Sequence, residues 1–246
     1  MARDSRELGG AWTRFQRHAH SSPPPDLAPY IERCWAVSWN YDKPYQQKIV
    51  PYPNVHLTVQ DGAARVTGVS SRFTIRVLDG ESDVVGVAFR PGCFRPWLGR
   101  AVSTITDQVI DAQEIFGAAP AEPGQAAMER FLRARLPDPD PVAFEAADVV
   151  ATIAEKPELT RVDAVARLAG LSVRQLQRLF AEYVGMGPKW VIRRYRLREV
   201  TQRMESGARI DWATLAPDLG YADQAHFTRD FKGMFGESPT AYAQRY

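Results

Sequence analysis

The last ninety residues of this chain contain an internal repeat at an offset of 51 residues. Both copies follow the pattern R-x-F-x4-G-x-[GS]-P, which begins at Arg178 in the first copy and at Arg229 in the second. A small residue and a glycine recur upstream at an offset of 50, as Ala166 and Gly170 and then as Ala216 and Gly220. A small residue where two helices cross, followed by a glycine where the chain reverses, is typical of a helix-turn-helix unit. The repeat therefore predicts two such units in succession.

The second helix of each unit carries an N-cap and an exposed polar face. Ser172 is followed three residues later by Gln175, which is the spacing of a capping box, and Asp223 takes the equivalent position in the second unit. The outward-facing side chains that we expect to read bases are Arg174, Gln177 and Arg178 in the first unit and Gln224, Ala225, Thr228 and Arg229 in the second. Such residue types match the donors, acceptors and methyl groups of the DNA major groove.

A long helix is predicted between the two units, opened by Gly187-Pro188 and closed near Gly207. The stretch from Gly187 to Arg209 holds seven basic residues and two acidic ones. Basic side chains near recognition helices can neutralise phosphates, which fixes orientation without reading sequence. The candidates for phosphate contacts are Ser172, Lys189, Arg193 and Arg194.

Composition indicates a globular protein and is uneven in charge. The chain is 45% hydrophobic and 24% charged, which is enough for a buried core. The formal net charge of +2 does not by itself argue for nucleic acid, but residues 157–246 carry 14 Lys and Arg against 10 Asp and Glu. The sequence shows neither a membrane-spanning run nor a secretory signal, so we expect a soluble, cytoplasmic protein without membrane contact.

The N-terminal half shows strand patterns instead of helical ones. Short β-branched or aromatic runs occur at Arg33–Trp39, His56–Val59, Phe73–Leu78 and Val84–Phe89. Hairpins are expected at Asp61-Gly62 and Asp79-Gly80. These features predict an α+β protein with a β-rich sandwich or barrel-like domain over residues 1–120, a helical and Pro-rich linker over 121–141, and an all-α domain with two helix-turn-helix units over 142–246.

Three sequence features leave alternatives open. The amphipathic segment 126–136 could pack on either domain or on a second copy of the chain. Trp35 and Trp39 share one face of a predicted strand and could line a ligand pocket, although filling a core is the commoner use of such residues. Cys93 lies in a Pro/Gly-rich loop, where it could be a redox-active thiol, although a buried, unreactive thiol is the commoner case.

The C-terminal residues 142–246 resemble the AraC/XylS family of transcription regulators. The resemblance is strongest in GYADQAHFTRDF, residues 220–231, and in FGESPTAY, residues 235–242. It implies recognition helices near Val173–Tyr183 and Gln224–Met234, and double-stranded DNA and RNA polymerase as partners. It also implies a small-molecule effector or a second copy of the chain bound by the N-terminal half, whose residues 88–99 and 105–109 look like an uncharacterised β-rich sensing domain. Pro217 departs from the family pattern and should kink the first helix of the second unit.

The rival class is a metal-dependent enzyme of β-barrel type with an accessory helical domain. Of the four histidines, only His18 and His20 have ligand-like spacing, and the two cysteines cannot form a four-cysteine zinc site. Phosphate-binding and nucleophile-elbow motifs are missing as well. We therefore expect neither enzyme activity nor a metal or cofactor, and an architectural DNA binder without a ligand switch is a third option. The sequence favours a ligand-responsive regulator that binds specific DNA.

Overall fold

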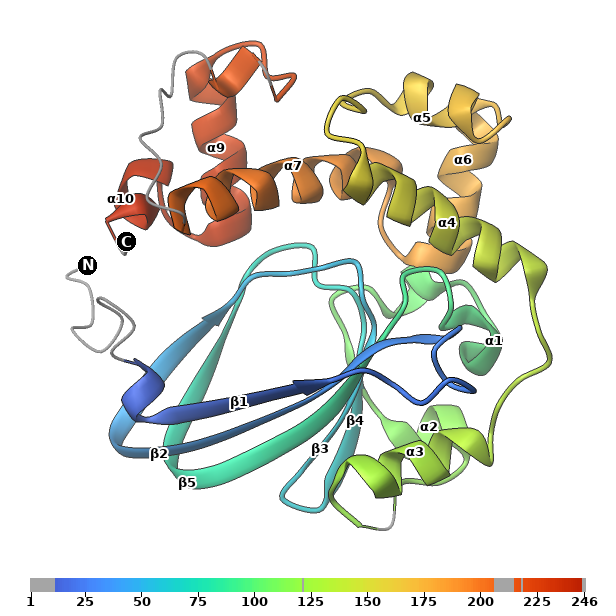
Figure 1. Cartoon of the computed structure of the whole chain (residues 1–246), viewed down its shortest axis with the longest axis vertical. Coiled ribbons are helices and arrows are strands. Elements are labelled where there is room, and N and C mark those ends of the chain that lie inside the picture. The colour runs from blue at the N-terminus through green and yellow to red at the C-terminus, as the bar shows by residue number, and fades with distance from the viewer. Residues whose placement is uncertain (1–11, 121, 206–214, 218, 245–246) are drawn as a thin grey trace.

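The protein is described by a computed structural model over residues 12–120, 122–205, 215–217 and 219–244. It is an α+β structure in which a six-stranded antiparallel sheet lies below a layer of C-terminal helices (Figure 1). Within these residues, no helix combines the length and the apolar character needed to cross a membrane.

The sheet is ordered β1-β2-β5-β3-β4-β6. Its strands are β1 (Gln16–Ser21), β2 (Ile31–Ile49), β3 (His56–Gln60), β4 (Ala63–Thr67), β5 (Thr74–Phe89) and β6 (Val109–Asp111). Asp61 and Gly62 form the expected two-residue hairpin between β3 and β4, with φ of 50° and 74°. Positive φ at both positions is the geometry that suits the right-handed twist of the two strands.

The hairpin expected at Asp79-Gly80 is wrong, because β5 runs through these residues as one long strand. Tyr41 of β2 pairs with Gly80 and Tyr45 pairs with Leu78, so three residues of β2 stand opposite a single residue of β5. Gly80 adopts φ of 56° at this irregularity. A bulge of this kind bends a ribbon without ending it, and the turn-like dipeptide marks the bend.

Side chains along β3 and β4 point alternately to the buried core and to the opposite face of the sheet. Leu57 and Val66 are fully buried on the core face, while His56, Thr58 and Arg65 point to the other side. The helical elements of this half are α1 (Arg95–Leu98), the 3-10 turn η2 (Val102–Ile105), α2 (Ala112–Phe116) and α3 (Gln125–Arg133). Helix α3 buries Met128, Phe131 and Leu132 in this N-terminal core, so segment 126–136 packs on the sheet.

The regular elements of the C-terminal half are all helical within its described residues. Its elements are α4 (Pro141–Glu155), α5 (Val162–Leu168), α6 (Val173–Leu179), the π-helical turn η3 (Phe180–Val184), α7 (Pro188–Glu205), α9 (Gln224–Phe235) and α10 (Pro239–Ala243). Asp140 caps α4 by accepting hydrogen bonds from Val142 N and Ala143 N, with Pro141 at the first helical position as expected. One apolar cluster joins α4 to α6 and the start of α7, and another joins the end of α7 to α9 and α10.

Helix α7 runs above the sheet from one group of C-terminal helices to the other and contacts both (Figure 1). Trp190, near its start, packs against all three apolar clusters and donates from Nε1 to Ser71 O at 3.0 Å. Thr106 Oγ1 donates to Gly185 O at 2.7 Å. Ion pairs Arg95–Glu182 and Lys48–Glu237, both at 2.9 Å, join the sheet domain to the ends of α6–η3 and α9. The N-terminal domain therefore holds both C-terminal groups.

Candidate nucleic-acid interface and N-terminal cavity

The turns of the two repeats have the same hydrogen bonds. After α5, Gly170 N donates to Arg167 O at 3.1 Å and Leu171 N donates to Ala166 O at 2.9 Å. Gly170 has φ of 68°, which an L side chain rarely adopts. The paired bonds and the left-handed glycine are a Schellman-type helix end.

The second unit repeats this turn at the positions expected from the sequence. Gly220, with φ of 78°, donates from its N to Pro217 O at 2.8 Å, and Tyr221 N donates to Ala216 O at 2.9 Å. Residues 215–217 are helical, and the side chain of Pro217 is exposed. Pro217 therefore supplies the carbonyl that the turn requires.

Helix α6 presents a polar face to solvent at its start. Ser172 and Gln175 form the expected capping box: Gln175 N donates to Ser172 Oγ at 3.2 Å and Ser172 N donates to Gln175 Oε1 at 2.9 Å. Leu176 is fully buried beneath the helix. The base-facing candidates Arg174, Gln177 and Arg178 are all exposed. The recognition helix expected over Val173–Tyr183 is α-helical to Leu179 and continues as the π-helical turn η3 to Val184.

Helix α9 presents the corresponding residues of the second unit. Asp223 caps it by accepting from His226 N at 2.6 Å. Gln224, Ala225 and Arg229 are exposed, and Thr228 is half-buried. Arg229 Nε donates to Ala225 O at 3.3 Å, so this guanidinium lies along the helix. Phe227 and Phe231 are fully buried on the opposite side.

An ion pair sets α9 against α7. Arg193 Nη2 lies 2.5 Å from Asp230 Oδ1, and the Asp230 side chain is only 14% exposed. His226 Nε2 lies 3.8 Å from Asp230 Oδ2, and its ring packs edge-on against Tyr221 with a centroid separation of 5.2 Å. Burial raises the pKa of the Tyr221 hydroxyl well above its usual range. His226 is thus a packed residue of this cluster.

Two of the four phosphate candidates have structural roles instead. Arg194 is 2% exposed, donates from Nε to Pro51 O, and holds its guanidinium 3.8 Å from the centroid of the Tyr52 ring. Burial lowers the pKa of Arg194. A phosphate cannot reach it, and Arg193 is committed to Asp230. Lys189 and Ser172 stay exposed, although the Ser172 hydroxyl is engaged in the cap.

Two further basic side chains of the helix between the units, Arg196 and Arg203, are also engaged within the protein. Arg196 is also 2% exposed and donates to the carbonyls of Ile153 and Lys156. Arg203 is bound to Glu199, and Arg209 lies outside the described residues. Because apolar and basic residues are mixed around α7, the sequence offers no single apolar face. A helix without a single apolar face is typical of one that packs against other elements on several sides.

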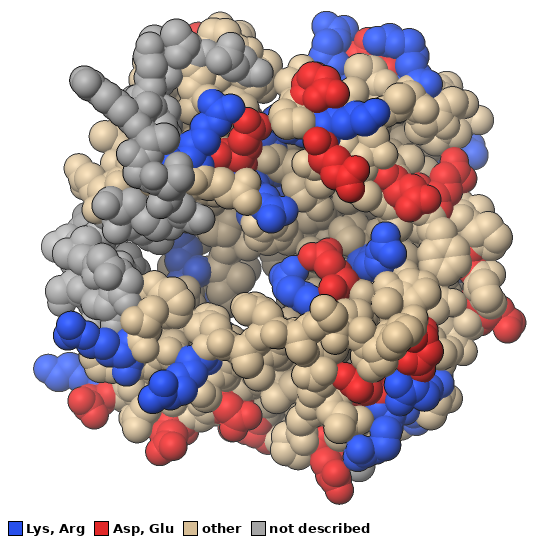
Figure 2. All heavy atoms as spheres, viewed as in Figure 1, with Lys and Arg blue, Asp and Glu red and all other residues tan. Residues whose placement is uncertain are grey.

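The face of the molecule shown in Figure 2 is mixed in charge. On the face shown in Figure 2, basic and acidic side chains are interspersed and form no single basic patch. The exposed starts of α6 and α9, at Arg174 and Gln224, are the candidate nucleic-acid interface.

Only one of the two candidate pocket tryptophans lines a cavity. Trp39 is 5% exposed, packs with Tyr41 and Leu78, and donates from Nε1 to Asp79 O at 3.3 Å, so its assignment to a ligand pocket is wrong. Trp35 lies across strand β5 at Gly86, where an added Cβ would come within 2.5 Å of its ring. Its Nε1 donates to His56 Nδ1 at 3.3 Å.

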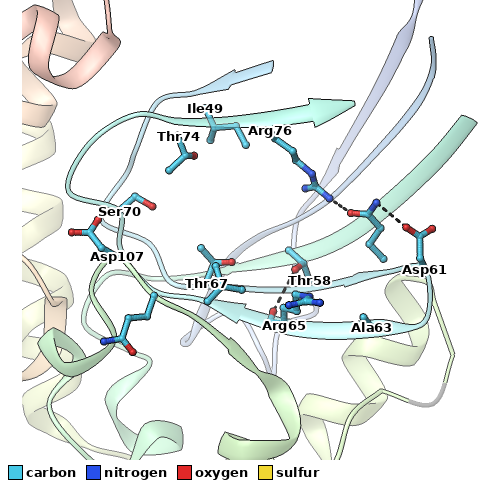
Figure 3. A pocket seen from close by; sticks show the side chains of 13 residues that line it. Ile49, Thr58, Asp61, Ala63, Arg65, Thr67, Ser70, Thr74, Arg76 and Asp107 are labelled. Carbon is cyan, nitrogen blue, oxygen red and sulfur yellow. Dashed lines mark hydrogen bonds between the residues drawn. The ribbon is translucent and has the colours of Figure 1, made fainter. Parts of the chain in front are cut away.

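A cavity lies between the polar face of β3–β4 and the part of the β2–β5 ribbon that contains Ile49, Thr74 and Arg76. Two adjoining and similarly open chambers, one of about 580 Å³ that we term the outer chamber and one of about 230 Å³ that we term the inner chamber, share six lining residues: Ile49, Thr58, Thr67, Ser70, Thr74 and Arg76. Figure 3 shows Ile49, Thr74 and Arg76 facing the β3–β4 side chains across the outer chamber. Trp35, Tyr52 and His56 line the inner one.

The two cysteines are buried, and two of the histidines lie on an exposed edge strand. Cys34 and Cys93 are free and buried, and burial raises the pKa of each thiol to about 11. Within the part of the chain that the structure describes, no three His, Cys, Asp or Glu side chains are placed to hold a metal ion. His18 and His20 lie on the exposed edge strand β1.

The duplicated turns and capped helices define a double helix-turn-helix protein, and comparison with known families agrees. Residues 165–245 match a family described as "Helix-turn-helix domain", and residues 19–111 match a "Domain of unknown function (DUF6597)". The C-terminal part of the chain is thus similar to helix-turn-helix domains, and its N-terminal part to a domain family of unknown function.

Known relatives cover parts of the chain. It is 36% identical over 129 residues to the HTH-type transcriptional regulator GlxA of Rhizobium meliloti (strain 1021); the match covers 52% of this chain and 38% of that protein's length. An AraC-type DNA-binding domain structure from Chromobacterium violaceum is 25% identical, covers 41% of this chain and 91% of its own, and gives a TM-score of 0.37. ToxT from Vibrio cholerae O395 covers 94% of this chain and 98% of its own at 10% identity, with a TM-score of 0.43.

Proposed function

We propose that this protein is a transcription regulator that binds specific duplex DNA with α6 and α9 in successive major grooves. The observation that carries the proposal is the duplicated turn, in which two matching pairs of hydrogen bonds each lead into a capped helix with an exposed polar start. Helix α7 joins the two units and packs against both. Linked helices of this kind suit grooves about 34 Å apart on one DNA face.

Base contacts are assigned to the exposed helix starts. Arg174, Gln177 and Arg178 would read one groove, and Gln224, Ala225, Thr228 and Arg229 the other. Arginine bonds guanine bidentately and glutamine bonds adenine, while Ala and Thr contact a thymine methyl group. Lys189 and the α6 N-terminus with Ser172 would contact phosphates.

The regulator is also proposed to respond to a ligand in the N-terminal cavity. Two segments line the inner chamber and also contact the C-terminal half. Val50–Tyr52 holds Arg194 of α7, and Ser70 is followed by Ser71, whose carbonyl accepts from Trp190. A ligand that fits one placement of these segments better than another would shift the population able to bind DNA.

The division into a sensing domain over 1–120, a connecting segment over 121–141 and a DNA-binding domain over 142–246 belongs to the same proposal. It places the protein in the cytoplasm, where RNA polymerase is the expected partner. A second copy of the chain is the expected partner of the N-terminal domain. The family match of the C-terminal domain supports these assignments.

The test is selection of a binding site from random duplexes, followed by titration of the full chain against that site and against scrambled DNA. A specific reader should prefer its site by roughly 10³-fold or more. A preference near unity at physiological salt would instead indicate an architectural DNA binder. Failure to bind any duplex at low ionic strength would contradict the proposal altogether.

A further inference from the structure

The inner chamber of the N-terminal cavity is rich in hydrogen-bond donors. Arg33 and Arg76 line it, and no carboxylate does so among the described residues. Hydroxyl groups of Thr67, Ser70 and Thr74 add further donors. Arg33 is paired with Glu32 at 2.7 Å, so Arg76 is the lining guanidinium that no carboxylate pairs with among the described residues.

The two carboxylates of the outer chamber are already engaged at its rim. Asp107 Oδ1 accepts from Ser71 N at 2.6 Å, while Asp61 accepts from Gln60 Nε2 at 3.0 Å and from Ser82 Oγ at 3.1 Å. Arg76 donates to Gln60 Oε1 and makes no ion pair within the described ranges. Its guanidinium lies 5.6 Å from the centroid of the Trp39 ring, which fixes its direction.

The inner chamber also contains an imidazole N–H donor and two aromatic rings. Trp35 Nε1 donates to His56 Nδ1, so the neutral imidazole carries its proton on Nε2. Burial lowers the pKa of His56 to about 4, so the ring is neutral near pH 7. The indole of Trp35 and the ring of Tyr52 are the aromatic surfaces of the chamber.

We propose that this cavity binds a small organic carboxylate, with its anionic group held by Arg76 and the neighbouring hydroxyls and its apolar part against Trp35 and Tyr52. The proposal deepens, and rests on, the ligand response described above. A carboxylate accepts several hydrogen bonds at once and pairs well with guanidinium groups. The larger chamber, at about 580 Å³, is in the volume range that small ligands occupy.

The experiment is calorimetric titration of the full chain with acetate, hexanoate and phenylacetate, each beside its uncharged carboxamide. At least one acid should bind, and its carboxamide should bind tenfold more weakly or not at all. Arg76→Gln should weaken the acid at least tenfold, while Arg72→Gln, at an exposed position outside the cavity lining, should not. Thermal unfolding of both variants without ligand establishes that each is folded.

Three results would overturn the assignment: no acid binds, the carboxamides bind as well as the acids, or folded Arg76→Gln binds the acid normally. DNA affinity is measured separately, with and without the acid. An acid that binds without changing DNA affinity supports the site and contradicts the proposed ligand response. DNA affinity that responds to other molecules while no acid binds overturns the site alone.

Discussion

Arg193 and Asp230 join the helix between the two units to the second recognition helix, through a 2.5 Å contact between Nη2 and Oδ1. Both side chains are largely shielded from solvent, at 34% and 14% exposure. The placement of α9 on α7 therefore depends on a specific charge pair as well as on apolar packing.

Removing either partner of this pair should weaken binding to the half of the site read by α9. We expect Arg193→Ala, Asp230→Ala and the double variant to show a coupling energy of about 1–2 kcal/mol in chemical unfolding. The reason is that one partner alone leaves a partly buried charge uncompensated. Strictly additive effects of the two single substitutions would show that the contact contributes nothing.

Arg174→Ala and Arg178→Ala should each cost on the order of 1–3 kcal/mol on the selected DNA site and relax discrimination at one base position. The loss follows from removing a bidentate contact to a base edge. Anisotropy titrations with single-base variants of the site measure it. Arg100→Ala, an exposed substitution in the N-terminal domain, is the control and should leave binding unchanged. Equal losses on every sequence would place both arginines at phosphates.

Lys189→Ala should weaken all duplexes alike and reduce the slope of log affinity against log salt by about 0.9. Arg194→Ala should leave that slope unchanged, since its guanidinium is buried against Pro51 and Tyr52. Titrations at four salt concentrations distinguish the two. A reduced slope for folded Arg194→Ala would contradict its structural role.

The same Arg194→Ala substitution should lower the free energy of unfolding by about 1–3 kcal/mol, because Pro51 O loses its buried donor. Arg198→Ala, an exposed change one turn away, should stay within about 0.5 kcal/mol of the parent. Urea unfolding of the full chain provides the comparison. Equal stability of the two variants would mean that the Arg194 contact is dispensable.

Stability should fall as the pH drops from about 6.5 to about 4, because the folded pKa of His56 is lowered from 6.5 to about 4 by burial. In that window the unfolded chain binds a proton that the folded chain does not, so acid favours unfolding by up to about 3 kcal/mol. Above pH 6.5 this contribution is fully present. Comparing His56→Gln with the parent by urea unfolding at pH 7, 5.5 and 4.5 isolates it. An identical pH dependence of the two proteins would exclude the role of His56.

Local sequence signals predicted the parts of the fold that depend on local geometry. The caps at Asp140, Ser172 and Asp223 and the turn at Asp61-Gly62 rest on backbone groups a few residues away, and all are found. The continuous strand β5 was missed because a bulge and a hairpin use the same dipeptide.

The burial of Arg194 and Arg196 was missed for a different reason. Each is set by an element distant in the sequence, namely the Pro51 carbonyl for Arg194 and the carbonyls of Ile153 and Lys156 for Arg196. Arginine residues are exposed far more often than buried, so residue type pointed the wrong way. The exposed polar faces of α6 and α9 remain predictions as a DNA-reading surface.

Trp190 fills space in three cores with one indole. Local unfolding of any one of these clusters would remove packing contacts from the Trp190 ring, and this would destabilise the other two clusters. We therefore expect the three clusters to unfold together. The protein should accordingly show a single cooperative unfolding transition in calorimetry, although its sequence indicates two domains and an internal repeat.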